Sequence, residues 1–295
     1  MYIIFGANGF LGSYIVKSIV ENTDEKVIAV ARNLDGMICS DRVSLVKCEI
    51  TDSKDVDALA ETLKKGETCK IIYLVTYNNI DLVAKYPKLA WDINIISLAS
   101  FLNKVENLNC LFFSSTDCVY GEGKPDYCFK ETDLLEPINL YGVYKIAAES
   151  LVTARGYNVL RLPYMFGPSI SPQKKHFYDK IVEDLKQQKT IEMFHDSLRS
   201  SLDYKTVADL FVSLAENYSE NNMPKIMNLC GDDCLSKYDL GLMMADKFGA
   251  SRDLIVPVSS KNDDSVFVER RAFAGLMDNS LLKSTLGISE LKIKI

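Results

Sequence analysis

Three glycines at three-residue spacing, in the segment GANGFLG, directly follow a short apolar run near the start of the chain. The apolar run at 2–6 indicates a strand, and the apolar spacing over 10–21 indicates a helix. A glycine turn between a strand and a helix lets backbone N–H groups approach a pyrophosphate at the positive end of the helix. Gly6 would make the turn, Gly9 would admit the phosphate, and Gly12 would let the helix pack closely. The segment therefore predicts a dinucleotide site that includes Gly6, Asn8, Gly9, Phe10, Leu11 and Gly12.

Short apolar runs alternate with helical patterns over the first half of the chain, which predicts a doubly wound parallel α/β sheet. The predicted strands are 2–6, 26–31, 43–48, 70–76, 109–115 and 157–162, and the predicted helices are 10–21, 53–65, 88–106 and 139–155. After Pro163 the alternation loosens. There the patterns indicate helices at 176–188, 204–217, 236–248 and 278–286, and strands at 190–194 and 225–229.

These patterns predict two domains, divided where the alternation loosens. Residues 1–162 would form a nucleotide-binding Rossmann domain, and residues 163–295 a smaller α/β substrate domain. A segment near 190–220 would return to the first domain.

Composition narrows the functional class. With 47% hydrophobic residues, a net charge of −6 and no apolar run of bilayer length, the chain is typical of a globular enzyme, and we expect it in the cytoplasm, away from membranes. The acidic balance argues against nucleic-acid binding. Eight scattered cysteines indicate a reduced protein, and the only histidines are His176 and His195, so we expect no metal site.

Arg32 directly follows the second predicted strand. At this position an acidic residue would bind the ribose hydroxyls of NAD, whereas a cation would bind the 2′-phosphate of NADP. The sequence therefore favours NADP(H) over NAD(H).

Tyr141 and Lys145 lie four residues apart in a predicted helix and so share one face. A neighbouring ammonium would stabilise the phenolate and lower the pKa of the tyrosine toward the range of an acid–base catalyst. Hydroxyls at Ser114, Ser115 and Thr116 follow a predicted strand, at the end where open α/β sheets bind ligands.

With GANGFLG, SSTDCVYG and YGVYK, the chain resembles the extended short-chain dehydrogenase/reductase family (NAD-dependent epimerase/dehydratase) over almost its whole length. The resemblance implies that Thr116 and Tyr141 grip a substrate oxygen, that Tyr141 transfers its proton, and that Lys145 holds the nicotinamide ribose. It further implies cofactor contacts from Glu49, Ile50, Leu74, Val75 and Thr76. The last three differ from the small alanines usual in the family.

Within the family, FKETDLLEPINLYGVYKIAAE is most similar to the dTDP-4-dehydrorhamnose reductase branch. That resemblance implies a nucleotide-sugar substrate whose diphosphate meets Arg271, and a homodimer. Arg199 would be a second cation for the same anion, since an acidic protein needs local cations to bind such a substrate. The 4,6-dehydratases of the family carry Thr-Asp-Glu where this chain has Thr116-Asp117-Cys118. Without the glutamate we expect no dehydration, and instead an NADP-dependent reduction of a 4-keto-6-deoxy sugar.

Four alternatives stay open, one of which is an interaction scaffold with a large exposed apolar patch and no affinity for the cofactor. A nucleotide-sugar 4-epimerase would use the same residues, and an epimerase/reductase of the GDP-fucose synthase type would use Cys118 and His176 as an acid–base pair. The two residues would otherwise serve packing and the start of a helix. A catalytically silent NADP-sensing protein would have no need of Tyr141 and Lys145.

Overall fold

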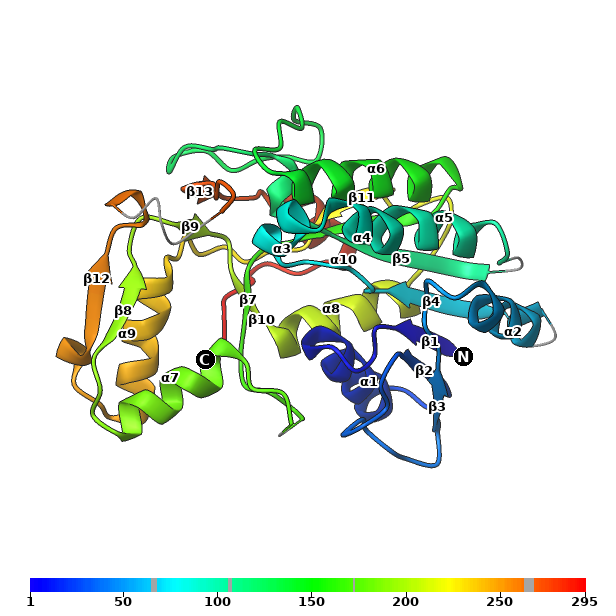
Figure 1. Cartoon of the computed structure of the whole chain (residues 1–295), viewed down its shortest axis with the longest axis horizontal. Coiled ribbons are helices and arrows are strands. Elements are labelled where there is room, and N and C mark those ends of the chain that lie inside the picture. Colours follow the sequence, from blue (N-terminus) through cyan, green and yellow to red (C-terminus); the bar gives the residue numbers. More distant parts are fainter. Residues whose placement is uncertain (65–67, 106–107, 172, 263–267) are drawn as a thin grey trace.

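A seven-stranded parallel sheet forms the centre of the computed structural model (Figure 1). The structure describes all residues except 65–67, 106–107, 172 and 263–267. The strand order is β11-β6-β5-β4-β1-β2-β3, and every neighbouring pair is parallel, which confirms the predicted doubly wound fold. The strands are β1 (Tyr2–Phe5), β2 (Val27–Ala31), β3 (Val43–Lys47), β4 (Cys69–Tyr73), β5 (Leu108–Thr116), β6 (Asn158–Leu162) and β11 (Ile226–Asn228).

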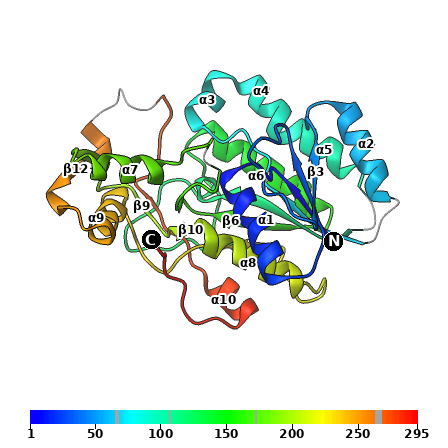
Figure 2. The same cartoon turned by 90° about the horizontal axis from the view of Figure 1, so that it is seen from below.

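Helices cover both faces of this sheet (Figure 2). On one face lie α1 (Phe10–Asn22) and α8 (Tyr204–Glu216), and on the other lie α2 (Ser53–Lys64), α5 (Ser97–Leu102) and α6 (Leu140–Ala154). Each face has its own buried apolar cluster. All four residues of β1 are buried, because a strand covered on two faces has no polar side.

The helix predicted over 88–106 is continuous in the structure from Pro87 to Leu102, where α4 (Pro87–Trp91), a π-helix η1 (Asp92–Ile96) and α5 follow one another without a break. A short helix that was not predicted, α3 (Ile80–Lys85), precedes it. Pro87 occupies the first turn of α4, because a proline lacks the N–H that a helix interior requires. Residue 106, like residue 65 of another predicted helix, lies outside the described residues.

A second lobe lies beside the sheet and consists of α7 (Phe177–Lys186), β8 (Ile191–Phe194), α9 (Lys237–Phe248) and β12 (Ile255–Val258) (Figure 1). These elements share a separate apolar cluster that includes Ile181, Met193, Met244 and Ile255. β8 corresponds to the strand predicted at 190–194. It pairs in parallel with β12, which the sequence did not predict. The remaining elements are β7 (Met165–Phe166), β9 (Leu198–Arg199), β10 (Leu202–Asp203), β13 (Ala274–Gly275), α10 (Ser280–Leu286), η2 (Asp117–Val119), η3 (Arg252–Leu254) and η4 (Ser260–Asn262).

The chain leaves the sheet after β6 and returns to it after β8. α8 packs on α1, and β11 pairs with β6 at the edge of the sheet. The division of the chain at residue 162 into two domains stays a prediction. Among the described residues, no helix has the length and apolar character needed to cross a membrane.

Candidate functional site

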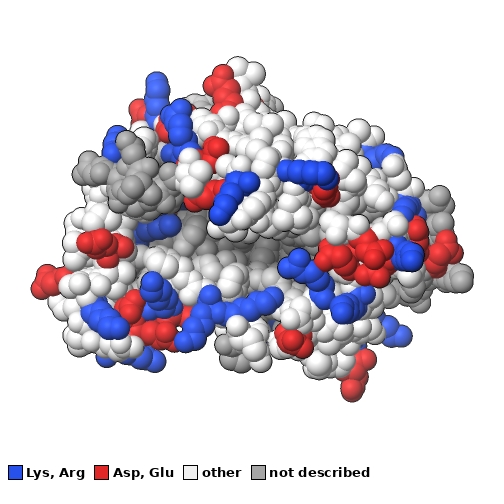
Figure 3. All heavy atoms as spheres, viewed as in Figure 1, with Lys and Arg blue, Asp and Glu red and all other residues white. Residues whose placement is uncertain are grey.

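A cleft of about 550 Å³ separates the carboxyl ends of the central strands from the second lobe. Figure 3 shows this face of the molecule hollowed, with Lys and Arg side chains along its rims. Ligands of open α/β sheets bind at this end of the strands. The lining includes Gly6, Gly9, Phe10, Leu11, Gly12, Leu74, Thr76, Thr116, Cys118, Tyr141, Lys145, His176, Arg199, Lys237 and Arg271.

The glycine turn has the shape that its sequence predicts. Gly6 has a φ of +81°, which favours glycine, and the Gly9 N–H donates to the Gly6 carbonyl at 2.8 Å. At Gly12 a Cβ would lie 2.2 Å from the same carbonyl oxygen, so only glycine lets α1 approach so closely. The first turn of α1 contains no acidic residue. Its N-terminus therefore offers a fitting place for the pyrophosphate of a dinucleotide.

The predicted adenosine contacts lie at the edge of this turn. Arg32 is 78% exposed, and its guanidinium lies 3.9 Å from the Glu49 carboxylate. Ile50 is buried beside them. Asn8 points away from the cleft, since its amide donates to the Asn33 carbonyl and ties the glycine turn to the loop after β2.

The loop after β4 is held by a residue that the sequence analysis missed. Asn94, buried in the π-helix η1, accepts a hydrogen bond from the Tyr77 N–H at 2.7 Å and one from the Thr76 hydroxyl at 3.2 Å. Leu74 and Thr76 line the cleft, whereas Val75 packs into the core on the α2 side. π-turns frequently occur at functional sites, and this one places an amide under the predicted cofactor loop.

The predicted catalytic groups converge at the end of β5. Thr116 ends the strand, while Tyr141 and Lys145 lie on α6, which Asn139 caps by accepting from the Gly142 N–H at 3.0 Å. α6 lies tightly against the strand end, because a Cβ at Gly142 would be 2.5 Å from the Cys118 carbonyl oxygen. Thr116, Tyr141 and Lys145 all face the cleft.

The protonation of Tyr141 differs from the sequence-based expectation. Burial, followed by the neighbouring Cys118, raises the pKa of its phenol. The Lys145 ammonium donates to the Ser114 carbonyl at 2.8 Å and lies 5.9 Å from the centroid of the Tyr141 ring. Burial lowers the pKa of Lys145 to about 7, although Glu149 opposes this. In the protein alone, Tyr141 therefore retains its proton and is suited to donate it.

Cys118 and His176 both line the cleft but are poorly prepared as an acid–base pair. Burial, together with Asp117, raises the pKa of the Cys118 thiol to about 12. His176 caps α7 by accepting from the Tyr178 N–H through Nδ1, and its Nε2 lies 3.0 Å from the Tyr204 hydroxyl. Both ring nitrogens are therefore occupied within the protein, and burial lowers the pKa of the ring.

The two arginines predicted to bind a diphosphate already have carboxylate partners. Arg199 pairs with Asp117 at 2.9 Å and also donates to the Leu198 and Ala272 carbonyls. Arg271 pairs with Asp81 of α3 at 2.8 Å. Both side chains line the cleft, and their role as diphosphate ligands stays a prediction.

Lys237 is a further cation in the cleft, and no sequence motif indicated it. It begins α9, and its ammonium lies 5.4 Å, 5.7 Å and 5.9 Å from the ring centroids of Tyr164, Phe177 and Phe194. Among the described residues it makes no ion pair. Burial, and then the charges of Arg199 and Arg271, lower its pKa.

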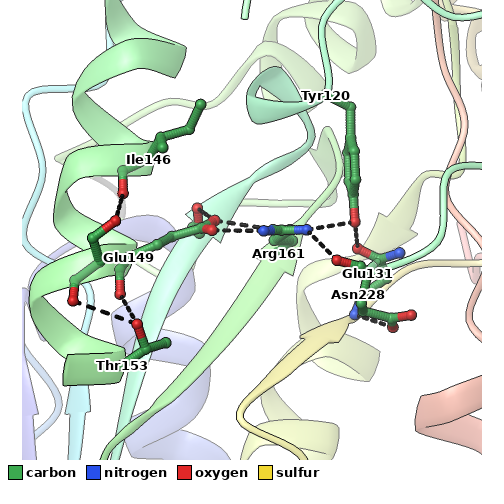
Figure 4. A network of polar contacts seen from close by, with 9 residues as sticks. Tyr120, Glu131, Ile146, Glu149, Thr153, Arg161 and Asn228 are labelled. Atoms are coloured by element: carbon green, nitrogen blue, oxygen red, sulfur yellow. Dashed lines mark hydrogen bonds and ion pairs between the residues drawn. The ribbon is translucent and has the colours of Figure 1, made fainter. Parts of the chain in front are cut away.

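A buried polar network joins β5, the strand that ends at Thr116, to the elements beside it (Figure 4). Arg161 of β6 donates to both carboxylate oxygens of Glu149, at 3.0 Å and 2.7 Å, and Glu149 in turn accepts from the Ser115 hydroxyl. The other end of Arg161 donates to the Tyr120 hydroxyl at 2.8 Å, which donates to Asn228 at 2.7 Å. The network thus fixes α6, β5, β6 and β11 relative to one another.

Several known proteins are similar to the chain over most of its length. It is 24% identical over 295 residues to methionine adenosyltransferase 2 subunit beta of Bos taurus, a match that covers 98% of this chain and 83% of the relative. The structure of dTDP-4-dehydrorhamnose reductase from Bacillus anthracis in complex with NADP has a TM-score of 0.79 at 19% identity and covers 98% and 94% of the two chains. That of UDP-glucuronic acid 4-epimerase from Bacillus cereus, in complex with UDP-glucuronic acid and NAD, has a TM-score of 0.81 at 19% identity, with coverages of 99% and 94%.

The family model described as RmlD substrate binding domain matches residues 1–292, nearly the whole chain. This match accords with the motifs at the glycine turn, the end of β5 and α6. The protein therefore belongs to the RmlD substrate binding domain family, the dTDP-4-dehydrorhamnose reductase branch of the extended short-chain dehydrogenases/reductases.

Proposed function

We propose that this protein is an NADP-dependent reductase of a 4-keto-6-deoxy nucleotide sugar. The observation that carries the proposal is the convergence of Thr116, Tyr141 and Lys145 in a cleft that also contains the glycine turn. The family match supports a nucleotide-sugar substrate. Arg32, and the similarity to a reductase in complex with NADP, support NADP(H) over NAD(H).

The residues present fit a nicotinamide dinucleotide, which when bound supplies the hydride for the carbonyl carbon. Gly6, Gly9 and Gly12 keep the α1 terminus open for its pyrophosphate. Thr116 and Tyr141 would hold the substrate carbonyl oxygen between their hydroxyls, and Tyr141 would donate its proton to that oxygen. Lys145, fixed by the Ser114 carbonyl, would hold the ribose hydroxyls and stabilise the tyrosinate that remains.

The states of Cys118 and His176 favour reduction over epimerisation of the GDP-fucose synthase type. Removal of a proton beside the ketone would require a thiolate, and burial disfavours the thiolate of Cys118. His176 would have to give up its contact with Tyr204 before it could donate a proton into the cleft. A 4-epimerase would use Tyr141 in both directions and is separated from a reductase by the test below.

A second candidate is a non-catalytic subunit of a methionine adenosyltransferase. The similarity to methionine adenosyltransferase 2 subunit beta, which spans 98% of this chain, favours it. A subunit of this kind would bind a catalytic partner chain and show no turnover of its own. The complete set of Thr116, Tyr141 and Lys145 favours the reductase.

The test is a turnover assay with purified protein, NADPH and a dTDP-4-keto-6-deoxy sugar. A reductase oxidises NADPH in proportion to the sugar reduced. An epimerase would yield an inverted sugar without net NADPH consumption, and either that result or the absence of turnover would contradict the proposal. In the absence of turnover, a stable complex with a methionine adenosyltransferase catalytic chain would support the second candidate.

We further propose that Lys237 binds the diphosphate of the nucleotide sugar. Its charge has no carboxylate partner among the described residues and faces the cleft from the second lobe. Lys237→Met should raise the KM for the sugar nucleotide about 10- to 100-fold, the value of one charge-assisted hydrogen bond, while the Kd for NADPH stays the same. Lys247→Met, in the last turn of the same helix, is the matched control. An unchanged KM in the Lys237 variant would contradict the assignment.

We also propose a homodimer. Large apolar side chains stay exposed on neighbouring elements: Leu82 of α3, Tyr86 between α3 and α4, Leu89 and Trp91 of α4, Ile96 of η1 and Val143 of α6. Exposed apolar side chains gathered on neighbouring elements favour association. Sedimentation should give the mass of two chains, and Ile96→Glu should give one. Leu134→Glu, at a residue that is 80% exposed outside this group, should leave the dimer intact. A monomeric unmodified protein would refute the proposal.

We propose a cytoplasmic location. All eight cysteines lie in the described part of the chain, and none is disulfide-bonded, as is usual in a reducing compartment. Imaging of the tagged chain tests this, and export from the cell would contradict it.

A further inference from the structure

A segment beyond β7 crosses from the second lobe to the glycine turn of the first. The Tyr14 hydroxyl of α1 donates to the Pro168 carbonyl at 2.9 Å. Ser171 and Gln173 lie against the loop after β2, where a Cβ at Gly36 would be 2.7 Å and 2.4 Å from their side-chain oxygens. These contacts place residues from the far side of the cleft next to the part of the dinucleotide site that is predicted to bind the adenosine.

Lys174 in this segment contacts the glycine turn itself. Its ammonium donates to the Asn8 carbonyl at 2.5 Å, across 166 positions of sequence. The next residue, Lys175, pairs with Glu183 at 2.5 Å. Lys174, by contrast, makes no ion pair among the residues that the structure describes. Its charge is therefore available to an anion at the turn.

Lys174 approaches the glycine turn from the second lobe, and Arg32 approaches it from the end of β2. Partial burial, and then the positive charge of Arg32, lower the pKa of Lys174, as expected for two cations that approach each other. Asn8, which accepts from Lys174, also donates to the Asn33 carbonyl directly after Arg32. The two cations repel each other even though the Glu49 carboxylate lies 3.9 Å from Arg32, and a phosphate dianion between them would reverse that repulsion.

We propose that Lys174 and Arg32 together bind a phosphate monoester on the adenosine ribose, the group that distinguishes NADP from NAD. The proposal rests on the dinucleotide cofactor of the proposed function and adds a residue that determines its specificity. The second lobe would then contribute directly to the choice of cofactor. NADP, but not NAD, would then contact Lys174 of the second lobe's segment and Arg32 of the first lobe at the same time.

The experiment compares Lys174→Met with Lys175→Met. Titration with NADPH and NADH should show a Kd for NADPH raised about 10- to 100-fold in Lys174→Met and unchanged in Lys175→Met, since only the former removes a charge-assisted contact to the phosphate. The Kd for NADH should change in neither variant. Adenosine 2′,5′-bisphosphate, but not AMP, should lose affinity in the same proportion as NADPH, which isolates the 2′-phosphate from the nicotinamide.

Equal weakening of NADPH and NADH would assign Lys174 a purely structural role at the glycine turn and overturn the proposal, as would no change in either. Failure of the unmodified protein to bind both nucleotides would overturn this proposal and the proposed function together. An unmodified protein that prefers NADPH but turns over no keto sugar would overturn only the reaction, and the Lys174 comparison would still decide the cofactor site.

Discussion

Tyr141→Phe should reduce turnover of the keto-sugar nucleotide by about 10²- to 10⁴-fold, the usual contribution of a positioned general acid. The phenol is buried at the end of β5 and retains its proton, so its removal leaves the substrate oxygen with the Thr116 hydroxyl but no proton donor. The ring, which packs against Val83 and Ala90, would stay in place. The Kd for NADPH, measured by nicotinamide fluorescence, should therefore be nearly unchanged while kcat falls.

Tyr144→Phe provides the matched control on the same helix. Tyr144 packs edge-on against Trp91, and its hydroxyl donates to the Pro87 carbonyl at 3.3 Å, outside the cleft. Loss of the Tyr144 hydroxyl should leave kcat almost unchanged. Normal turnover by Tyr141→Phe would show that another group supplies the proton.

Arg161→Met should lower the free energy of unfolding by about 3–5 kcal/mol, the range for removing one partner of a buried ion pair. The side chains of Arg161 and Glu149 are 2% and 4% exposed. Without the guanidinium, the Glu149 carboxylate would stay buried with the Ser115 hydroxyl, and Tyr120 would lose its donor. Urea unfolding followed by circular dichroism measures the effect.

A surface pair of the same chemistry serves as the control. Arg252 donates to both oxygens of Asp246, but the two side chains are 62% and 54% exposed, so Arg252→Met should leave the unfolding midpoint almost unchanged. Replacing Glu149 by leucine in the Arg161→Met background should recover part of the lost stability, because no unpaired charge would then be buried. Equal effects of Arg161→Met and Arg252→Met would mean that the buried network contributes little.

Local sequence patterns predicted the sheet well but not every helix. The runs that became β1, β2 and β5 are apolar on both faces, and this character comes from burial between two helical layers. The helix predicted over 88–106 is present from Pro87 to Leu102, but its apolar pattern did not reveal the π-turn that buries Asn94 under the loop after β4. Helix prediction from apolar periodicity takes no account of a buried polar residue such as Asn94.

The candidate site was predictable where its residues share one local element. Tyr141 and Lys145 are four residues apart on one helix, and their common face follows from spacing alone. The partners of the cations could not be predicted in this way, since Arg199 meets Asp117 and Arg271 meets Asp81 across long separations. Lys174 was missed for the same reason, because its contact with Asn8 depends on how the two lobes are joined.

The return of the chain to the sheet has a consequence for its synthesis. Until residue 228 has left the ribosome, β6 presents an open edge, and the apolar surface of α1 lacks α8, its later cover. A nascent chain that ends shortly after β6 would therefore carry an incomplete and aggregation-prone sheet. The sheet of this protein can therefore be completed only after α7 and β8, the first half of the second lobe, have been translated, while α9 and β12 of that lobe are still to follow.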